Sequence, residues 1–324
     1  MKAIIYTQYG KPEVVQVQEY PKPIPKENEV LVQVMASTVN RTDAGFRSAE
    51  YFISRFWSGL FKPNYPILGC EFAGIVEEIG EKVSSFKKGD KVFGFNDKTF
   101  GGHAEYLCIA ESEAICTMPT NSTFEEAAAI SEGAHYALCN IRASKVHSGM
   151  QVMVYGATGA IGSAAVQILK SMKVHVTAVC NTKNVALVQS LGADVVIDYE
   201  KEDYTQLNTP FDFIFDAVGK SSFSISKKLL KPTGIYISTE LGKNGANVFL
   251  ALLTPILGGK KVLFPLPFIH KEDVLFLKNL VEQNQFKPVL DKSYSFNEIV
   301  EAYQYVDSGQ KTGNVILKVA NPKY

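Results

Sequence analysis

Three glycines stand at every third position of one short stretch and form the clearest chemical signal in the sequence. They are Gly156, Gly159 and Gly162, within the run Gly156-Ala157-Thr158-Gly159-Ala160-Ile161-Gly162. Glycine lets the backbone approach a ligand closely, and the amides at the positive end of a helix that begins there bind phosphate. The spacing therefore predicts that this run holds a pyrophosphate group. A tight turn without a ligand is the alternative.

The elements on either side of the glycine run are those needed to hold a phosphate there. Residues 152–155 form a short apolar run that is typical of a buried parallel strand. Apolar residues recur at helical spacing from Ala164 to Leu169, and residues 174–179 indicate a second strand. Strand, glycine turn, helix and strand within about thirty residues form the context of a dinucleotide-binding fingerprint. We therefore expect a dinucleotide cofactor.

The end of the second strand bears on which dinucleotide binds. An NAD site usually places Asp or Glu there to bind the ribose 2′-hydroxyl, whereas this strand is followed by Asn181, Thr182 and Lys183. A cation and two small polar side chains suit a 2′-phosphate, which a carboxylate would repel. The sequence thus favours NADPH over NADH. Lys183 as an ordinary solvated lysine is the alternative.

Composition and charge exclude several other classes of protein. The chain has 324 residues, 46% of them hydrophobic, and a formal net charge of zero. A neutral balance gives no electrostatic reason to bind nucleic acid or an anionic membrane. The N-terminus becomes polar too soon for a secretory signal, and the apolar stretch 248–257 is broken by Thr254 and Pro255. We expect a cytoplasmic protein without a membrane partner.

The cysteines indicate neither a structural metal nor a disulfide framework. They number five and contain no C-x-x-C pair. Their positions are 70, 108, 116, 139 and 180.

Two domains are expected from the order of the elements. Many short strand-like runs separated by glycine turns indicate a barrel-like β domain in the first part of the chain. From residue 122 onward strands and helices alternate, which predicts a doubly wound parallel sheet of the α/β class. We place the first domain at residues 1–121 and 267–324, and the second at 122–266.

Several motifs in a fixed order resemble the medium-chain dehydrogenase/reductase superfamily. They are Val39-Asn40-Arg41-Thr42-Asp43, the run 69–80, Lys87-Lys88-Gly89-Asp90-Lys91-Val92, the run 101–106, the glycine run 156–162 and the closing run 311–317. The resemblance covers nearly the whole chain. It implies a GroES-like β-barrel catalytic domain, a Rossmann domain and an active site in the cleft between them.

One departure from that family concerns metal. Zinc alcohol dehydrogenases bind catalytic zinc at positions that correspond here to Asn40, Cys70 and, by a looser alignment, Ser131. Asn and Ser are poor zinc ligands, and one cysteine cannot fill a three-ligand site. The four-cysteine lobe of those enzymes is absent from the sequence as well. No metal is expected, and a zinc-type NADP alcohol dehydrogenase is the alternative.

Without a Lewis acid the accessible chemistry is hydride delivery to an acceptor that is already polarised. The sequence resembles the quinone oxidoreductase and enoyl (alkenal) reductase branch, which implies a small apolar quinone or α,β-unsaturated carbonyl as substrate. The developing enolate then needs hydrogen bonds and a proton. A non-catalytic NADPH-binding protein with a redox-sensing or structural role is the second alternative.

The resemblance implies catalytic candidates. Asn40 would donate to the substrate carbonyl, unless it is a turn residue, and Thr42 matches a proton-relay hydroxyl. Tyr51 and Tyr65 are candidate proton donors at the two ends of an aromatic segment. That segment, whose large side chains are Phe52, Ile53, Phe56, Trp57, Leu60 and Phe61, is interpreted either as a mobile lid over the substrate or as a helix packed on a core.

The resemblance also implies further contacts with the cofactor. His135 stands where relatives have a threonine at the nicotinamide ribose, and a packing histidine is its alternative. The other expected contacts are Tyr199 near the adenosine, the backbone of Ala217, Val218 and Gly219, and Asn314 near the nicotinamide. Residues 262–265 would form an edge strand that pairs between subunits, so we expect a homodimer.

Overall fold

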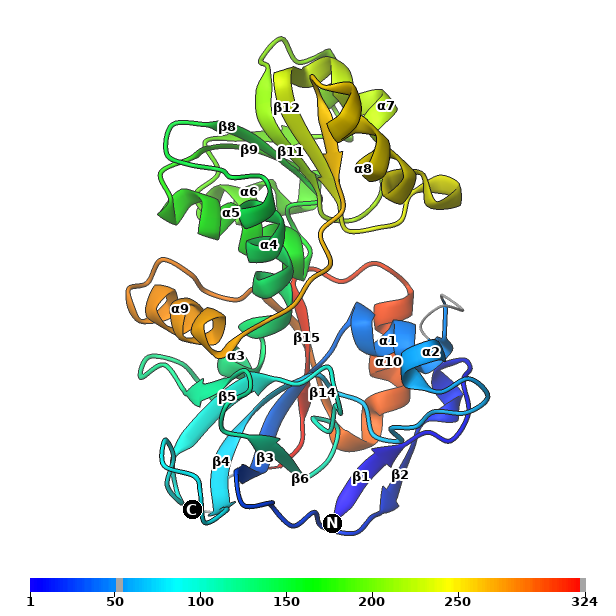
Figure 1. The fold of residues 1–324 in the computed structure, drawn as a ribbon, viewed down its shortest axis with the longest axis vertical. Helices are drawn as coiled ribbons and strands as arrows, with labels where there is room; N and C mark the ends of the chain where they lie inside the picture. Colours follow the sequence, from blue (N-terminus) through cyan, green and yellow to red (C-terminus); the bar gives the residue numbers. More distant parts are fainter. Residues whose placement is uncertain (51–54, 321–324) are drawn as a thin grey trace. The chain divides into compact units, whose positions relative to one another are not determined.

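The computed structural model describes residues 1–50 and 55–320. The chain forms two compact units: Met1–Glu132 together with the chain from Ile269 onward, and Gly133–Phe268 (Figure 1). The first unit therefore extends past the predicted boundary at residue 121 and includes the helix α3 (Phe124–Ala128). Helix α4 (Ser131–Ala143) carries the chain into the second unit.

A seven-stranded sheet forms the centre of the first unit. Its order is β14-β15-β3-β4-β5-β7, with β6 paired to β3, and β1 and β2 form a separate antiparallel pair. The strands are β1 (Lys2–Ile5), β2 (Gln16–Glu19), β3 (Glu29–Val39), β4 (Glu71–Ile79), β5 (Lys91–Phe95), β6 (Tyr106–Ala110), β7 (Ile115–Thr117), β14 (Leu290–Ser295) and β15 (Asn314–Lys318). The other helices of the unit are α1 (Arg41–Ser48), α2 (Arg55–Ser58), α9 (Lys271–Glu282) and α10 (Ile299–Asp307).

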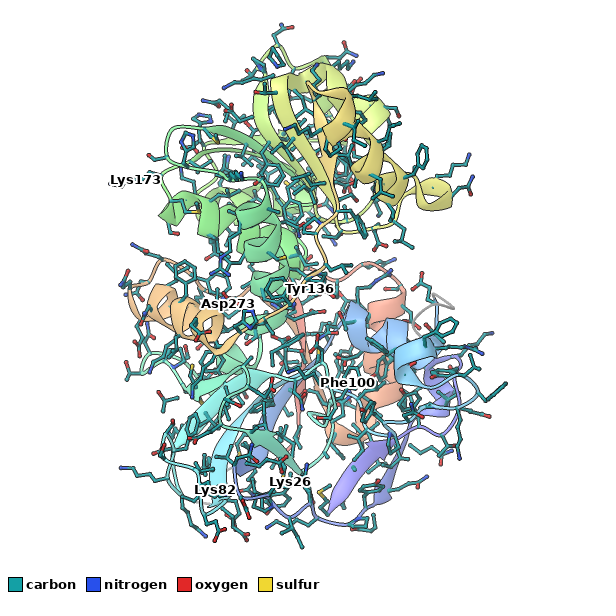
Figure 2. All side chains as sticks on the ribbon, viewed as in Figure 1. Lys26, Lys82, Phe100, Tyr136, Lys173 and Asp273 are labelled. Carbon is teal, nitrogen blue, oxygen red and sulfur yellow. The ribbon has the colours of Figure 1, made fainter. Side chains whose placement is uncertain are left out.

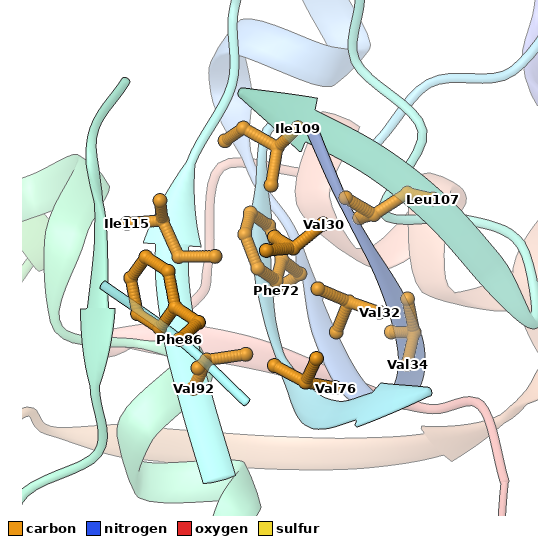
Figure 3. Packing of buried hydrophobic residues seen from close by; sticks show 10 residues of the cluster. All are labelled: Val30, Val32, Val34, Phe72, Val76, Phe86, Val92, Leu107, Ile109 and Ile115. Atoms are coloured by element: carbon orange, nitrogen blue, oxygen red, sulfur yellow. The ribbon is translucent and has the colours of Figure 1, made fainter. Parts of the chain in front are cut away.

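Alternation along β3 builds the core of this sheet. Val30, Val32 and Val34 lie on one face of the strand because successive side chains of a strand point to opposite faces. They pack with Phe72 of β4 and with aliphatic side chains of neighbouring strands in one buried cluster (Figure 3). This core holds β3 and β4 in place, and the candidate residues Asn40 and Thr42 follow the end of β3, beside the start of β4.

The second unit is a parallel sheet with helices on both faces (Figure 1). The strand order is β10-β9-β8-β11-β12-β13, and every pairing in it is parallel. The strands are β8 (Gln151–Tyr155), β9 (His175–Cys180), β10 (Val195–Asp198), β11 (Phe211–Asp216), β12 (Leu230–Ser238) and β13 (Lys261–Leu263). The helices are α5 (Ala160–Ser171), α6 (Val185–Ser190), α7 (Phe223–Ser226) and α8 (Ala246–Leu257).

This order is that of a doubly wound Rossmann sheet, as predicted. Counted along the unit it is 3-2-1-4-5-6, and the direction of winding reverses between β8 and β11. Ligands of such sheets bind outside the carboxyl ends of the strands at that reversal. The predicted glycine run directly follows β8, so the sequence placed it at the expected point. Within the described ranges, no helix is both long and apolar enough to cross a bilayer.

Candidate active site and cofactor site

Two of the three glycines are required by the fold of the turn itself. Gly156 has φ +80°, a conformation that L-residues rarely adopt, and a Cβ there would lie 2.6 Å from the side chain of Val218. A Cβ on Gly162 would lie 2.1 Å from the carbonyl oxygen of Gly156. These two glycines therefore let α5 pack directly against the end of β8.

Gly159 differs from its neighbours because nothing fills the space beside it. It is the N-cap of α5, with φ −72° and ψ 170°, and the nearest heavy atom to a Cβ placed there is the Gly156 oxygen at 4.0 Å. Among the described residues no side chain caps this helix end, and its first turn carries no acid. An open space beside uncapped helix amides fits a pyrophosphate, so the residues here suit the predicted dinucleotide.

The loop after β11 lies next to this turn and is held by hydrogen bonds to a buried carboxylate. Asp216 is fully buried, and its carboxylate accepts hydrogen bonds from the amides of Val218 (3.2 Å) and Ser221 (2.9 Å). The amide of Ala217 donates to the carbonyl of Tyr155 at 3.0 Å. The predicted backbone of Ala217, Val218 and Gly219 is thus brought to the glycine turn at the winding reversal.

The ribose end contains acids that the linear sequence did not reveal. The Thr182 hydroxyl donates to the Asp198 carboxylate (2.7 Å), and the Thr182 amide donates to Glu200 (3.1 Å). Asp198 is opposite Cys180 in the β9–β10 register, so the neighbouring strand carries its carboxylate to the tip of β9. The expectation of a tip without acids was wrong because it considered β9 alone.

The remaining residues at this end agree with a site for a cofactor. Lys183 is exposed, and the Asn181 carboxamide accepts a hydrogen bond from Asn184 at 2.7 Å. Tyr199 is 48% exposed and lines a cavity of about 410 Å³ together with Tyr155. The structure thus brings the residues after β9 and Tyr199 to one edge of the sheet.

In the first unit Asn40 holds together the turn between β3 and α1. It is 2% exposed and caps α1, because its side-chain oxygen accepts from the Asp43 amide at 2.9 Å. Its Nδ2 donates to the Cys70 sulfur at 3.1 Å. The geometry agrees with the alternative of a turn asparagine, and the catalytic role of Asn40 stays a prediction.

The donor set beside Asn40 does not fit a catalytic zinc ion. Cys70 is buried with its sulfur accepting a hydrogen bond from Asn40 Nδ2, and an asparagine amide is a poor zinc ligand. Over residues 1–50 and 55–320, no three His, Cys, Asp or Glu side chains are grouped so that they could hold a metal ion.

Thr42 leads into a buried pair of acids that the sequence reasoning missed. Its hydroxyl donates to Glu132 Oε1 at 2.7 Å. The neighbouring Glu71 accepts from the amides of Ser131 (2.9 Å) and Glu132 (2.6 Å) through Oε1 and from the Thr38 hydroxyl (2.6 Å) through Oε2. Burial raises the pKa of Glu71 to about 8 and that of Glu132 to about 7. The available signal in the sequence was that Glu71 and Glu132 each stand within a largely apolar segment, where a buried carboxyl is expected to have a special role.

Among the other predicted residues, Tyr65 and His135 are described and Tyr51 is not. Tyr65 is 36% exposed with its ring edge against Phe100, whereas Tyr51 lies outside the described residues. The side chain of His135 is 3% exposed, and the centre of its ring lies 4.5 Å from the ring centre of Tyr136, which is labelled in Figure 2. Of the predicted aromatic segment, only Arg55–Ser58 is described as a helix, α2.

Asn314, at the start of β15, carries an unsatisfied buried atom. The residue is 4% exposed, and its Nδ2 donates to the carbonyl of Val289 at 3.1 Å. Its side-chain oxygen has no hydrogen-bond partner within the part of the chain that the structure describes. Buried polar atoms are nearly always bonded, so this atom fits an amide donor from a bound molecule, as the nicotinamide prediction requires.

Comparison with known proteins agrees with this architecture. A family model described as an alcohol dehydrogenase GroES-like domain matches residues 26–146, and one described as a zinc-binding dehydrogenase matches residues 191–317. The 2-methylene-furan-3-one reductase of Solanum lycopersicum is 30% identical over 98% of this chain and 79% of its own length. The chloroplast envelope quinone oxidoreductase homolog of Arabidopsis thaliana is 30% identical over 98% of both chains. The chain belongs to the medium-chain dehydrogenase/reductase family.

A solved structure shows that the similarity extends over the whole fold of this chain. The quinone oxidoreductase from Coxiella burnetii matches with a TM-score of 0.87, 26% identity and 99% coverage of both chains. As a medium-chain dehydrogenase/reductase, the protein is an oxidoreductase of a family that uses NAD(P)H.

Proposed function

We propose that the protein is a zinc-independent, NADPH-dependent reductase of quinones or α,β-unsaturated carbonyls. The hydrogen bond from Asn40 to Cys70 carries this proposal. It ties together two side chains at positions where zinc alcohol dehydrogenases hold their metal, and only one of them is a zinc ligand type. The names of the Arabidopsis and Coxiella relatives, both quinone oxidoreductases or homologs of one, support the choice of acceptor.

The residues that would hold the cofactor are those at the carboxyl edge of the second unit's sheet. The pyrophosphate would rest on the amides at Gly159 to Gly162, and the loop Ala217–Gly219 would lie along it. Ala157, Thr158, Ala160 and Ile161 complete the turn. Bound NADPH supplies the hydride and both electrons of the reaction. His135 and Asn314 would hydrogen-bond the nicotinamide end.

Lys183 supports the choice of NADPH over NADH. Lys183 is an exposed cation directly after β9, where a 2′-phosphate would lie. The two acids at this edge are already engaged, because Asp198 accepts from Thr182 and lies 3.0 Å from the Lys201 amine. The Lys201 charge therefore partly offsets that of Asp198, while Glu200 accepts from the Thr182 amide.

The candidate groups around the acceptor are assigned by their chemistry. Thr42 is a half-buried hydroxyl in contact with a buried acid, while Tyr51 and Tyr65 are alternative donors. Asn40 Nδ2 donates to Cys70 at 3.1 Å and to Thr38 at 3.4 Å, so it would polarise the acceptor carbonyl only by giving up one of these two bonds. A quinone needs no such help, because its reduced form is stabilised by its own ring.

We also propose that the protein is a homodimer that forms along the edge strand β13. The neighbouring helix α8 exposes large apolar side chains: Phe249, Leu252, Ile256 and Leu257 are 66–83% exposed. The buried side chains of α8 are instead the polar Asn247 and Thr254. The Thr254 hydroxyl accepts a hydrogen bond from the amide of Val262 in β13 at 2.8 Å. An exposed apolar helix beside an open strand edge supports a second copy of this chain as the occupant.

A screen of purified protein tests the proposed activity. The loss of NADPH absorbance is followed with a series of quinones, enals, enones and simple ketones, and metal content is measured on the same sample. The proposal expects reduction of quinones or conjugated carbonyls with zinc far below one per chain. Turnover of simple alcohols that needs stoichiometric zinc would favour the zinc-type dehydrogenase over the proposed reductase, and tight NADPH binding without turnover would indicate the redox-sensing alternative.

Cytoplasmic residence stays a prediction, and cell fractionation would test it.

A further inference from the structure

A connected polar chain crosses the interior of the first unit. The Thr42 hydroxyl donates to Glu132 Oε1 at 2.7 Å, and the Glu132 amide donates to Glu71 Oε1 at 2.6 Å. Glu71 is fully buried and Glu132 is 4% exposed, so both carboxyls lie away from water. An isolated carboxylate in such a place is costly, and this cost is what keeps a proton on the pair near neutral pH.

Thr42, at one side of this network, is half-buried. Lys311 is half-buried as well and acts on the network through its charge, while its amine donates to the carbonyl of Gly313 at 2.7 Å. The Lys311 charge favours the ionised forms of Glu132 and Glu71. The other charged groups that face the network are Asp43, which opposes ionisation of both acids, and Arg41 and Asp291, which act on Lys311.

The two acids differ in what surrounds their oxygens. Glu71 Oε1 accepts from two backbone amides, which only donate. Glu71 Oε2 accepts from the Thr38 hydroxyl, which is fully buried and itself accepts from Asn40 Nδ2 at 3.4 Å, so both oxygens of Glu71 are held as acceptors. Glu132 Oε1 faces a threonine hydroxyl, which donates or accepts according to its rotation. Glu132 is therefore the member of the pair that can pass a proton onward.

We propose that Glu132 is the proton reservoir of the reductase and delivers its proton through the hydroxyl of Thr42 to the reduced acceptor. The inference rests on the proposed function. Hydride addition leaves an enolate or a hydroquinone anion. The Thr42 O–H bond then breaks as a new C–H or O–H bond forms on the acceptor, and Glu132 passes its proton to the Thr42 oxygen. The resulting Glu132 carboxylate is stabilised by Lys311 and regains a proton from water. Thr42 is then the catalytic residue, and Glu132 acts through it.

Glu132→Gln tests the proposal because glutamine still accepts the hydrogen bond from Thr42 but holds no transferable proton. With an enone that the wild type reduces, we expect kcat to fall about 100-fold in Glu132→Gln and in Thr42→Val, in the range of a lost general acid. Thr42→Ser keeps the hydroxyl and is expected to restore most of the rate. The double variant Thr42→Val/Glu132→Gln is expected to fall no further than either single variant, because the two groups act as one unit.

The pH profile separates a proton role from a structural one. The wild-type kcat/KM is expected to decrease as pH rises through about 7, where burial places the pKa of Glu132, and the Glu132→Gln profile is expected to be flat. Asp273→Asn is the matched control, since it removes another buried carboxyl of this unit, on α9 (labelled in Figure 2), and is expected to keep the wild-type profile. NADPH affinity and thermal unfolding of each variant confirm that it folds.

Three results would overturn the inference. A Glu132→Gln enzyme with wild-type kcat and an unchanged pH profile removes Glu132 from the proton path. Losses that multiply in the double variant show that the two residues act separately. A wild-type protein that fails to oxidise NADPH with any quinone or enone overturns the proposed function and this inference together. The first two results differ from this one because in both of them the wild-type enzyme is active.

Discussion

Replacing Gly159 with alanine separates cofactor binding from folding. The new methyl group meets no heavy atom closer than 4.0 Å, and φ −72° suits alanine, so the folded state accommodates it. The small loss at an N-cap and the small gain from a stiffer unfolded chain nearly cancel, and the free energy of unfolding should change by less than about 1 kcal/mol. The same methyl group occupies the space in which we place the pyrophosphate.

The expected loss in affinity follows from the contacts that the methyl group displaces. One charge-assisted hydrogen bond is worth about 1.5–3 kcal/mol, so the Kd for NADPH should rise by roughly 10- to 150-fold. Titration of NADPH fluorescence measures the Kd, and urea unfolding without cofactor measures stability. Gly45→Ala is the matched control, because its methyl group also enters open space but lies in α1 of the other unit. Unchanged affinity in Gly159→Ala would refute the placement of the pyrophosphate.

Gly162→Ala should behave in the opposite way to Gly159→Ala. Its Cβ would lie 2.1 Å from the Gly156 oxygen, so α5 must move away from β8 and stability should fall by about 1–3 kcal/mol. A stable Gly162→Ala protein with normal NADPH affinity would show that the turn is not packed as described.

Three further outcomes are expected. Lys183→Glu should raise the Kd for NADPH about 10- to 100-fold and leave that for NADH nearly unchanged, which competition binding measures; equal effects on both would remove the 2′-phosphate from this edge. The free energy of unfolding should fall by about 2–3 kcal/mol between about pH 6.5 and 8, because buried acids with a raised pKa hold protons that the unfolded chain has released; urea titrations at several pH values check this, and a rise would contradict it. These acids are Asp43, Glu71 and Glu132. Below about pH 6.5 His103, whose pKa burial lowers to about 4, takes up one proton in the unfolded chain, which reduces the trend but does not reverse it against the three acids. Ile256→Asp should convert a dimer to a monomer in light scattering; an already monomeric wild type would exclude the proposed dimer.

Local patterns in the sequence were sufficient to predict the strand, glycine turn and helix at residues 151–171. The apolar run before Gly156, the glycine spacing and the helix after it are all short-range features, and the structure contains each of them in that order. The doubly wound sheet followed from the alternation of strands and helices. The likeness to a known family then supplied the strand order that short-range patterns do not contain.

Long-range pairing explains what the sequence did not reveal. Thr42 and Glu132 are separated by 90 positions and meet only because α1 and α4 both begin beside the start of β4. Asp198 reaches Thr182 only through the register of β10 against β9. Neither contact has a periodic signal, so neither acid could be assigned to its site before the strands were paired.

The most direct test of the account is the steady-state oxidation of NADPH with an enone or quinone by protein that has been dialysed against a chelator and analysed for metal. We predict turnover that is independent of residual zinc and does not increase when zinc is added back. Activity that disappears on dialysis and returns in proportion to added zinc would contradict it.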